Sequence, residues 1–298
     1  MNMHDKMLRG VLMGRTARFT AISAKGLVEE ARRTHGLSRV CTAALGRALQ
    51  MTAMLGVKLK NENEKVTAII KGGGMAGNLV CTANALGQVK GYLENPALEL
   101  PPTPDGKLDV ALAVGWFGEL TVVRDLSMKE PYVGRCALVS GELGEDFAHY
   151  LTVSEQTPSL VYLGVRVDVE TGAVLAAGGL VIEALPGCPE ETLAILEQKA
   201  EAVRGLTRML EQGQTLEGAL SALFEGCDLE ILQGYSPEFH CDCARERLER
   251  VLLSLGEAEL ADMIEKDHGA EMTCRFCNTV YRFDENDLAK LRKEASGE

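Results

Sequence analysis

The sequence predicts an α+β protein with a large main domain of mixed β-sheet and helix (residues 1–186), a helical linker (187–236) and a small C-terminal domain (237–298). Strand-like and helix-like patterns are interspersed as far as Pro186, and mainly helical spacing follows. The last segment holds two close pairs of cysteines, four of the nine in the chain. A chain of 298 residues is long enough for a large core with a smaller appendage.

The main domain combines short strands with one long helix. Between Ser38 and Val57 only Arg39 and Arg47 are charged, so this run predicts a helix that is buried on most sides. A short helix is expected over 144–153 and a proline-rich loop over 95–104. Alternation or β-branched residues predict strands over 16–23, 65–71, 108–114, 119–124, 160–169 and 174–184.

A glycine-rich stretch over 72–77 matches the G-x-G-x-x-G pattern of dinucleotide-binding sites. Such a site also needs a helix that begins at the glycines. Residues 78–83 read as extended instead, and Gly87 interrupts soon afterwards. A glycine-rich hairpin is therefore the favoured interpretation.

The linker begins at a change of pattern after Pro186. Pro189 followed by Glu190 and Glu191 is typical of a helix start, because acidic side chains favour the positive end of the helix dipole. Leucines at helical spacing then run to Leu223, with a break near Gly213. Short amphipathic helices are marginal alone, so this segment is expected to dock its apolar face on another part of the protein.

The charge of the chain argues against two classes of partner. Its 31 basic and 43 acidic side chains give a net charge of −12, which disfavours nucleic acid and anionic membranes. The longest apolar run, 173–182, is too short to span a bilayer. The basic N-terminal segment is expected to face acidic parts of the same protein through five arginines: Arg9, Arg15, Arg18, Arg32 and Arg33.

The cysteines fall into two classes. No secretory signal is apparent, so a reducing, cytoplasmic environment is expected, in which thiols serve as core residues, metal ligands or redox centres. Cys41, Cys81 and Cys136 lie in apolar stretches and are interpreted as core residues. Cys188 and Cys227 are isolated in the linker and would become reachable if it unfolded.

The C-terminal cysteines predict a zinc site. Cys241 and Cys243 form a C-x-C pair, and Cys274 and Cys277 form a C-x-x-C pair after 30 intervening residues. Two close pairs joined by a helical spacer fit four thiolates around tetrahedral zinc. The segment has few large apolar residues and needs such a staple. His240 and His268 are alternative ligands, but four thiolates already complete the coordination sphere.

The same arrangement suggests a redox switch. An oxidant that attacks one thiolate makes a sulfenic acid, which a neighbouring thiol can resolve to a disulfide. Disulfides within the two close pairs would close very small loops and could not replace a crosslink across 30 residues. Oxidation would then release the metal, unfold the C-terminal domain and free the linker.

These residues resemble the redox-regulated thirty-three-kilodalton heat-shock chaperone family. The resemblance rests on H-C-D-C at 240–243, C-R-F-C at 274–277, GYLENPALELPP at 91–102 and GELGEDFAHYLTVSEQTPS at 141–159. It implies an ATP-independent holdase, inactive when reduced and bound to one zinc ion per chain, and activated by oxidants with unfolding stress. It further implies zinc ligation by Cys241, Cys243, Cys274 and Cys277.

The resemblance also implies the oxidised form and the partners. Disulfides Cys241–Cys243 and Cys274–Cys277 would form on activation, together with a homodimer that binds unfolded or partly folded client proteins.

Two other functions remain open at this point. A thiol–disulfide oxidoreductase would use Cys274 and Cys277 as its redox pair, although they do not sit at a thioredoxin-like strand-to-helix junction. A zinc-ribbon regulator would bind nucleic acid, but residues 237–298 carry 9 basic and 15 acidic side chains, which opposes phosphate contact.

Overall fold

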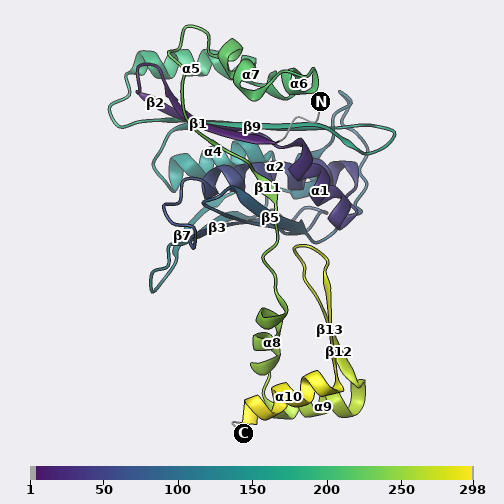
Figure 1. Ribbon diagram of the computed structural model, residues 1–298. Helices are drawn as coiled ribbons and strands as arrows, with labels where there is room; N and C mark the ends of the chain where they lie inside the picture. Colours follow the sequence, from purple (N-terminus) through teal and green to yellow (C-terminus); the bar gives the residue numbers. More distant parts are fainter. Residues whose placement is uncertain (1–4, 297–298) are drawn as a thin grey trace. The chain divides into compact units, whose positions relative to one another are not determined.

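Helix α2 (Arg39–Gly56) is buried almost all round because it lies between two β-sheets (Figure 1). Sixteen of its eighteen residues are buried, which confirms the helix predicted from the scarcity of charge in this run. The computed structural model describes residues 5–296. The described chain divides into two units between His240 and Cys241.

The first sheet has the strand order β10-β1-β2-β9-β8, with all neighbours antiparallel. Its strands are β1 (Lys6–Leu12), β2 (Ala17–Ser23), β8 (Ser159–Val167), β9 (Val174–Ala184) and β10 (Glu230–Tyr235). Strand β9 is buried on both faces. Val181 joins the core around α2, whereas Leu180 and Ile182 face the opposite side of the sheet. Burial on both sides explains the long apolar run in this part of the sequence.

The second sheet has the order β11-β5-β4-β3-β6-β7, in which only β11 is parallel to its neighbour. Its strands are β3 (Lys65–Lys71), β4 (Leu79–Asn84), β5 (Gln88–Leu93), β6 (Glu119–Asp125), β7 (Tyr132–Ala137) and β11 (Glu238–Phe239). Residues 72–77 join the antiparallel strands β3 and β4, and no helix begins there. The hairpin interpretation is confirmed, and the dinucleotide alternative fails.

One predicted strand is wrong. The expected strand over 108–114 contains helix α3 (Val110–Val114). The side chain of Asp109 accepts a hydrogen bond from the backbone N–H of Leu112 at 2.9 Å and caps this helix. The end of this helix lies close to the backbone of Gly72. Only glycine allows this approach, since a Cβ on Gly72 would lie 2.3 Å from the Val114 carbonyl oxygen. The helix cap and the close packing thus outweigh the preference of the β-branched residues for a strand.

Two more helices complete the layer around α2. Helix α1 (Lys25–His35) was not predicted, whereas α4 (Leu143–Val153) confirms the short helix expected over 144–153. The other predicted strands correspond to β2, β3, β6, β8 and β9.

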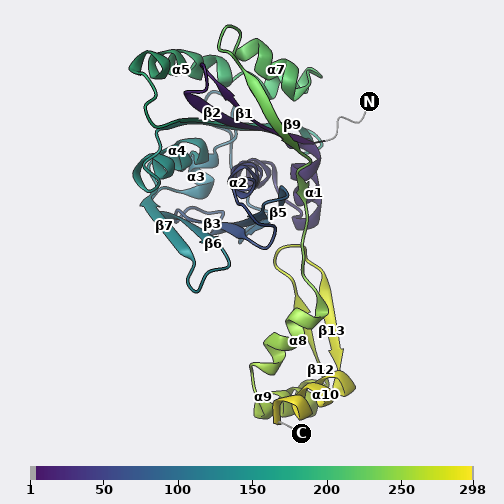
Figure 2. The ribbon, with the colours of Figure 1, turned by 60° about the vertical axis from the view of Figure 1, so that its left-hand side comes forward.

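Three helices of the predicted linker cover the face of the first sheet that points away from α2 (Figure 2). They are α5 (Glu190–Val203), α6 (Leu206–Glu211) and α7 (Leu216–Leu223). The Thr207 and Tyr162 hydroxyls are 2.8 Å apart where α6 meets β8. Gly164 of β8 permits this approach, because a Cβ there would lie 2.2 Å from Thr207 Oγ1.

The segment after α7 adds an edge strand to each sheet. Strand β10 pairs with β1, and the register shifts between Arg9 and Gly10. Strand β11 then pairs with β5, and the His240 N–H donates to the Val89 carbonyl at 2.9 Å. The sequence reading did not predict either strand. The division of function among residues 1–186, 187–236 and 237–298 stays a prediction.

The expectation that the N-terminal arginines face acidic residues elsewhere in the protein is confirmed for Arg15 and Arg18 only, because Glu29, the partner of Arg32 and Arg33, lies within the basic segment itself. Arg15 pairs with Glu230 at 2.9 Å and Arg18 with Glu183 at 3.0 Å, while Arg32 and Arg33 both bind Glu29. Arg9 differs from the other four arginines because its guanidinium donates to two neutral acceptors, the carbonyl of Val57 at 2.7 Å and the hydroxyl of Tyr235 at 3.3 Å.

The second unit is a small helical and hairpin structure. It contains α8 (Arg245–Leu253), α9 (Glu257–Asp262), a π-helical turn (Met263–Asp267), β12 (Gly269–Thr273), β13 (Val280–Asp284) and α10 (Glu285–Ser296). Its core consists of five buried side chains: Leu252, Leu260, Phe283, Leu288 and Leu291. The Arg245 guanidinium lies 4.2 Å from the centre of the Phe283 ring. Across residues 5–296, none of the helices is long and apolar enough to cross a membrane.

Candidate metal centre

The two cysteine pairs occupy different kinds of local structure in the second unit. Cys241 and Cys243 lie in the irregular stretch that precedes α8. Cys274 and Cys277 lie in the turn between β12 and β13. The Cys274 N–H donates to the carbonyl of Thr279 at 2.9 Å, and Asn278 completes the turn with a positive φ of 56°. The hairpin therefore fixes the positions of Cys274 and Cys277, whereas no regular structure holds Cys241 and Cys243.

The four sulfurs come together at one point. All four Sγ atoms lie within 4.8 Å of one another. The distance is 3.8 Å between Cys241 and Cys274 and 3.3 Å between Cys243 and Cys277. Sulfurs at about 2.3 Å from a shared zinc ion stand about 3.8 Å apart at the corners of a tetrahedron. Four soft thiolate donors at this spacing fit zinc, with every coordination position taken by the protein.

Two neighbouring hydroxyl groups hydrogen bond to the cluster. The Tyr281 hydroxyl lies 3.1 Å from the Cys243 sulfur, and the Thr279 hydroxyl lies 3.2 Å from the Cys277 sulfur. Sequence reasoning did not single out either residue. Their closeness to the C-x-x-C pair was the available signal, since Tyr281 is four residues beyond Cys277 on the adjoining strand.

The thiols in the cluster differ in acidity. Burial opposes ionisation of Cys277, but hydrogen bonding with Thr279 and with its sulfur neighbours outweighs this and lowers its pKa to about 7. Burial raises the pKa of Cys274. The hydrogen bond to Cys243 raises the pKa of Tyr281 to about 12, so this phenol stays neutral and can donate to sulfur. Such contacts favour a thiolate at Cys277, the form that binds metal and reacts with oxidants.

The histidines lie outside the cluster of metal-ligating atoms found among the described residues. His268 is 72% exposed at its side chain, and its Nδ1 lies 2.8 Å from a carboxylate oxygen of Glu285. His240 is exposed and belongs to the first unit. The preference for thiolates over these two alternative ligands agrees with this geometry.

The remaining cysteines have a different environment. Cys41 and Cys81 are buried in the core around α2, and burial raises the pKa of both thiols. Cys136 is half-buried, and its pKa is raised to about 11 by burial and by the charge of Asp146. Cys227 is buried and Cys188 half-buried in the linker. The core assignment is confirmed for Cys41 and Cys81 and holds in part for Cys136.

The chain is similar in sequence and fold to proteins described as 33 kDa chaperonins. The family model described as Hsp33 protein matches residues 5–284. A 33 kDa chaperonin of Clostridioides difficile is 42% identical over 98% of this chain and 100% of its own length. One from Alkaliphilus metalliredigens is 43% identical with the same coverage. The crystal structure of the 33 kDa chaperonin from Thermotoga maritima superposes with a TM-score of 0.90 at 35% identity, covering 99% of this chain and all of that one.

The family match answers the question that the cysteine spacing had left open. Hsp33 proteins are non-enzymatic holdases, which sets aside the thiol–disulfide oxidoreductase alternative. The gathered thiols agree with one zinc ion per chain. The α+β fold and its C-terminal four-cysteine cluster also agree with the solved structure of a relative. The chain belongs to the Hsp33 family of redox-regulated chaperones, which bind client proteins and have a zinc site of four cysteines near the C-terminus.

Proposed function

We propose that this protein is an ATP-independent cytoplasmic holdase that binds unfolded or partly folded proteins and prevents their aggregation under combined oxidative and heat stress. Residues 1–186 bind clients and form a homodimer on activation, 187–236 is the linker and 237–298 is the redox switch. No nucleic acid or membrane takes part. The gathering of four thiols in a unit with five buried core side chains among its described residues carries this proposal.

In the reduced form Cys241, Cys243, Cys274 and Cys277 hold one zinc ion. When bound, the ion supplies a crosslink between the segment before α8 and the β12–β13 turn. Metal binding in small domains contributes on the order of 10–16 kcal/mol of apparent folding free energy. The reduced form is therefore the folded, inactive form.

Oxidation converts the four thiolates to disulfides Cys241–Cys243 and Cys274–Cys277. Peroxide oxidises one thiol of a pair to sulfenic acid and is reduced to water. The second thiol then attacks that sulfur, and a second water leaves as the S–S bond forms. Each pair loses two electrons to one peroxide molecule. The pairing between sequence neighbours is favoured because one or two residues separate them, so they stay close as the unit loosens.

Local pairing removes the crosslink instead of replacing it. A disulfide that closes a very small loop removes little entropy from the unfolded chain. Cross-pairing of Cys243 with Cys277, whose sulfurs are 3.3 Å apart, would keep the unit tied together. Which pairs form therefore decides whether the switch opens.

Opening of the switch frees apolar surface in the linker. Strand β11 ends two residues before Cys241, so a loosened second unit no longer anchors the end of the linker. Leu206, Leu216 and Leu220 are buried in the cluster that also holds Phe19 and Ile182 of the first sheet. Undocking exposes both sides of this contact, and apolar surface is what a non-specific binder of unfolded chains requires.

The test treats reduced, zinc-loaded protein with peroxide at a mildly raised temperature. Metal release, disulfide pairing by peptide mass mapping and suppression of client aggregation are followed in the same sample. We expect all three to rise together, with the two neighbour pairs as the products. Zinc release without a gain in aggregation suppression contradicts the switch. A folded product with Cys241–Cys274 and Cys243–Cys277 bonds contradicts the local pairing.

A further inference from the structure

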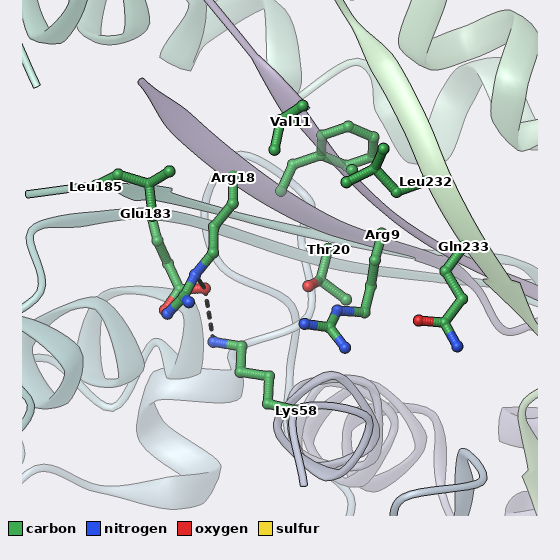
Figure 3. Close-up of a pocket in the computed structure, with 11 residues that line it drawn as sticks. Arg9, Val11, Arg18, Thr20, Lys58, Glu183, Leu185, Leu232 and Gln233 are labelled. Atoms are coloured by element: carbon green, nitrogen blue, oxygen red, sulfur yellow. Dashed lines mark hydrogen bonds and ion pairs between the residues drawn. The ribbon is translucent and has the colours of Figure 1, made fainter. Parts of the chain in front are cut away.

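A pocket of about 230 Å³ lies where linker strand β10 meets β1, and it has no part in the thiol chemistry (Figure 3). Strands β1, β2 and β9 supply most of its lining, and Lys58 enters from the end of α2. Strand β10 contributes Leu232 and Gln233. The β1–β10 register shift at Arg9 and Gly10 falls at this pocket, and such irregularities re-aim side chains in a sheet.

The pocket has a surplus of positive charge. Glu183, 2% exposed at its side chain, pairs with Arg18 at 3.0 Å and with Lys58 at 2.8 Å. Arg9 lines the same pocket and has no carboxylate partner among residues 5–296. The lining thus holds three cations and one carboxylate, Glu183. A second carboxylate, Glu155, acts on Arg18 and Lys58 from outside the lining but is itself paired with Arg124. The positive charges therefore outnumber the negative ones by two.

Lys58 has donor capacity to spare. Its Nζ atom is buried and lies 2.8 Å from the Glu183 carboxylate, the one ion-pair partner it has among residues 5–296. An ammonium group has three donors, and a buried charge is costly unless it is paired and hydrogen-bonded. Burial accordingly lowers the pKa of Lys58. Arg18 is half-exposed, so at least one cation of the lining is accessible to solvent.

We propose that this pocket binds a dianionic phosphate group, either free phosphate or a small phosphate monoester. Arginine and lysine side chains are the usual ligands of phosphate, and two charges on the ligand match the two in excess. Val11 and Leu232 add apolar side chains to the lining, which can contact the organic part of a monoester (Figure 3).

Binding would hold β10 on the first sheet. A ligand that touches both β10 and β1 binds only while the linker strand is docked, so it stabilises the docked state by linkage. The side chains of β10 are otherwise mostly exposed, and the strand has few apolar contacts of its own. This regulatory consequence rests on the proposed function, because it assumes that undocking of the linker activates the chaperone.

The test of the site needs no chaperone activity. Reduced, zinc-loaded full-length protein is titrated calorimetrically with inorganic phosphate and, separately, with phenyl phosphate, while chloride keeps the ionic strength constant. We expect saturable millimolar or tighter binding. Tighter binding of phenyl phosphate points to a monoester, and equal or weaker binding points to free phosphate. Absence of saturable binding of both probes overturns the proposal.

Four variants locate the binding. Lys58→Met and Arg9→Gln each remove one pocket cation, and about a tenfold loss of affinity is expected for each. Arg33→Gln removes an exposed cation that lies outside the pocket lining, and it is expected to leave the affinity unchanged. Arg9→Lys keeps the charge but loses the planar guanidinium, so its affinity for the probe should lie between those of wild type and Arg9→Gln. This intermediate affinity would show that the loss in Arg9→Gln comes from the missing charge and not from misfolding. Equal affinity in wild type and a folded Lys58→Met protein overturns the site.

A second measurement separates the site from its regulatory effect. The time that peroxide needs to activate the wild-type protein is compared with and without the tighter-binding probe. We expect a several-fold delay that is absent in Arg9→Gln. An unchanged time despite binding overturns the coupling to β10. Failure of the probe-free protein to suppress aggregation would instead count against the proposed function.

Discussion

The two units of this protein obtain their stability in different ways. In the first unit, α2 lies between two sheets and a second apolar cluster joins the first sheet to the linker helices. The second unit has five buried core side chains and four gathered thiols. Small domains bury too little surface to fold securely without a staple. We therefore propose that a thiol switch acts in the second unit, where a bound metal would supply the missing stability.

The cysteines show the same contrast. Burial raises the pKa of Cys41 and Cys81 in the first unit, which keeps them protonated and unreactive. The C-terminal thiols are half-buried and hydrogen-bonded, and the pKa of Cys277 is lowered to about 7. An oxidant should therefore react with the second unit and leave the core of the first intact.

Metal removal is the largest test of this contrast. Chelation of zinc from reduced protein should remove on the order of 10 kcal/mol of apparent folding free energy from the second unit alone. Hydrogen exchange should show loss of amide protection in β12, β13 and α10, with protection retained in α2. Cys277→Ala, which removes one of the four thiols, should cause the same loss of amide protection. Cys136→Ala, which removes a thiol of the first unit, should leave that protection unchanged. Persistent protection of β12 and β13 after metal removal would contradict the dependence on zinc.

Truncation of one core ring in each unit gives the next largest effect. Phe283→Ala should cost about 3–5 kcal/mol, because this ring is buried in a five-residue core and lies under the Arg245 guanidinium. Zinc release on heating should begin at a clearly lower temperature, as followed with a metal-sensitive dye. Phe147→Ala deletes a buried ring in the first unit and should leave the zinc-release temperature unchanged. Equal release temperatures for Phe283→Ala and wild type would contradict the prediction.

The linker contact gives a smaller effect. Leu206→Ala removes a fully buried side chain between α6 and the first sheet and should weaken docking by about 2–5 kcal/mol. The reduced protein should then suppress client aggregation at a lower temperature than wild type. Ile195→Ala on α5 is the control, since this side chain is partly exposed. Identical aggregation suppression by the two variants would show that docking does not limit activity.

The smallest expected effect concerns a helix cap in the linker. The Thr215 hydroxyl accepts a hydrogen bond from the Gly218 N–H at 3.1 Å at the start of α7. Thr215→Ala should destabilise the docked linker by about 1 kcal/mol. Hydrogen exchange of α7 measures this directly. Thr152→Ala, on the exposed side of α4, should leave that exchange unaltered, and an equal change in both variants would argue against capping.

Sequence patterns correctly predicted those elements whose burial determines the composition of their own residues. Helix α2 was predicted because burial on all sides excludes charge, and β9 because it is apolar on both faces. The cysteine spacing predicted a four-thiol cluster. Helix α3 was wrongly predicted as a strand. Its β-branched residues favour a strand, whereas the Asp109 cap and the close contact with Gly72 favour a helix.

By itself, the sequence determined the fold class, the glycine-rich hairpin, the amphipathic linker helices and the four cysteines that meet. The tertiary structure alone decided the positions of β10 and β11, which add to the edges of two sheets. It also decided that Arg9, Arg18 and Lys58 share a pocket with Glu183, and that Tyr281 bonds to a thiol. Pairing at a sheet edge and convergence of charges join residues distant in the chain, whereas sequence patterns report mainly on neighbours within a few turns.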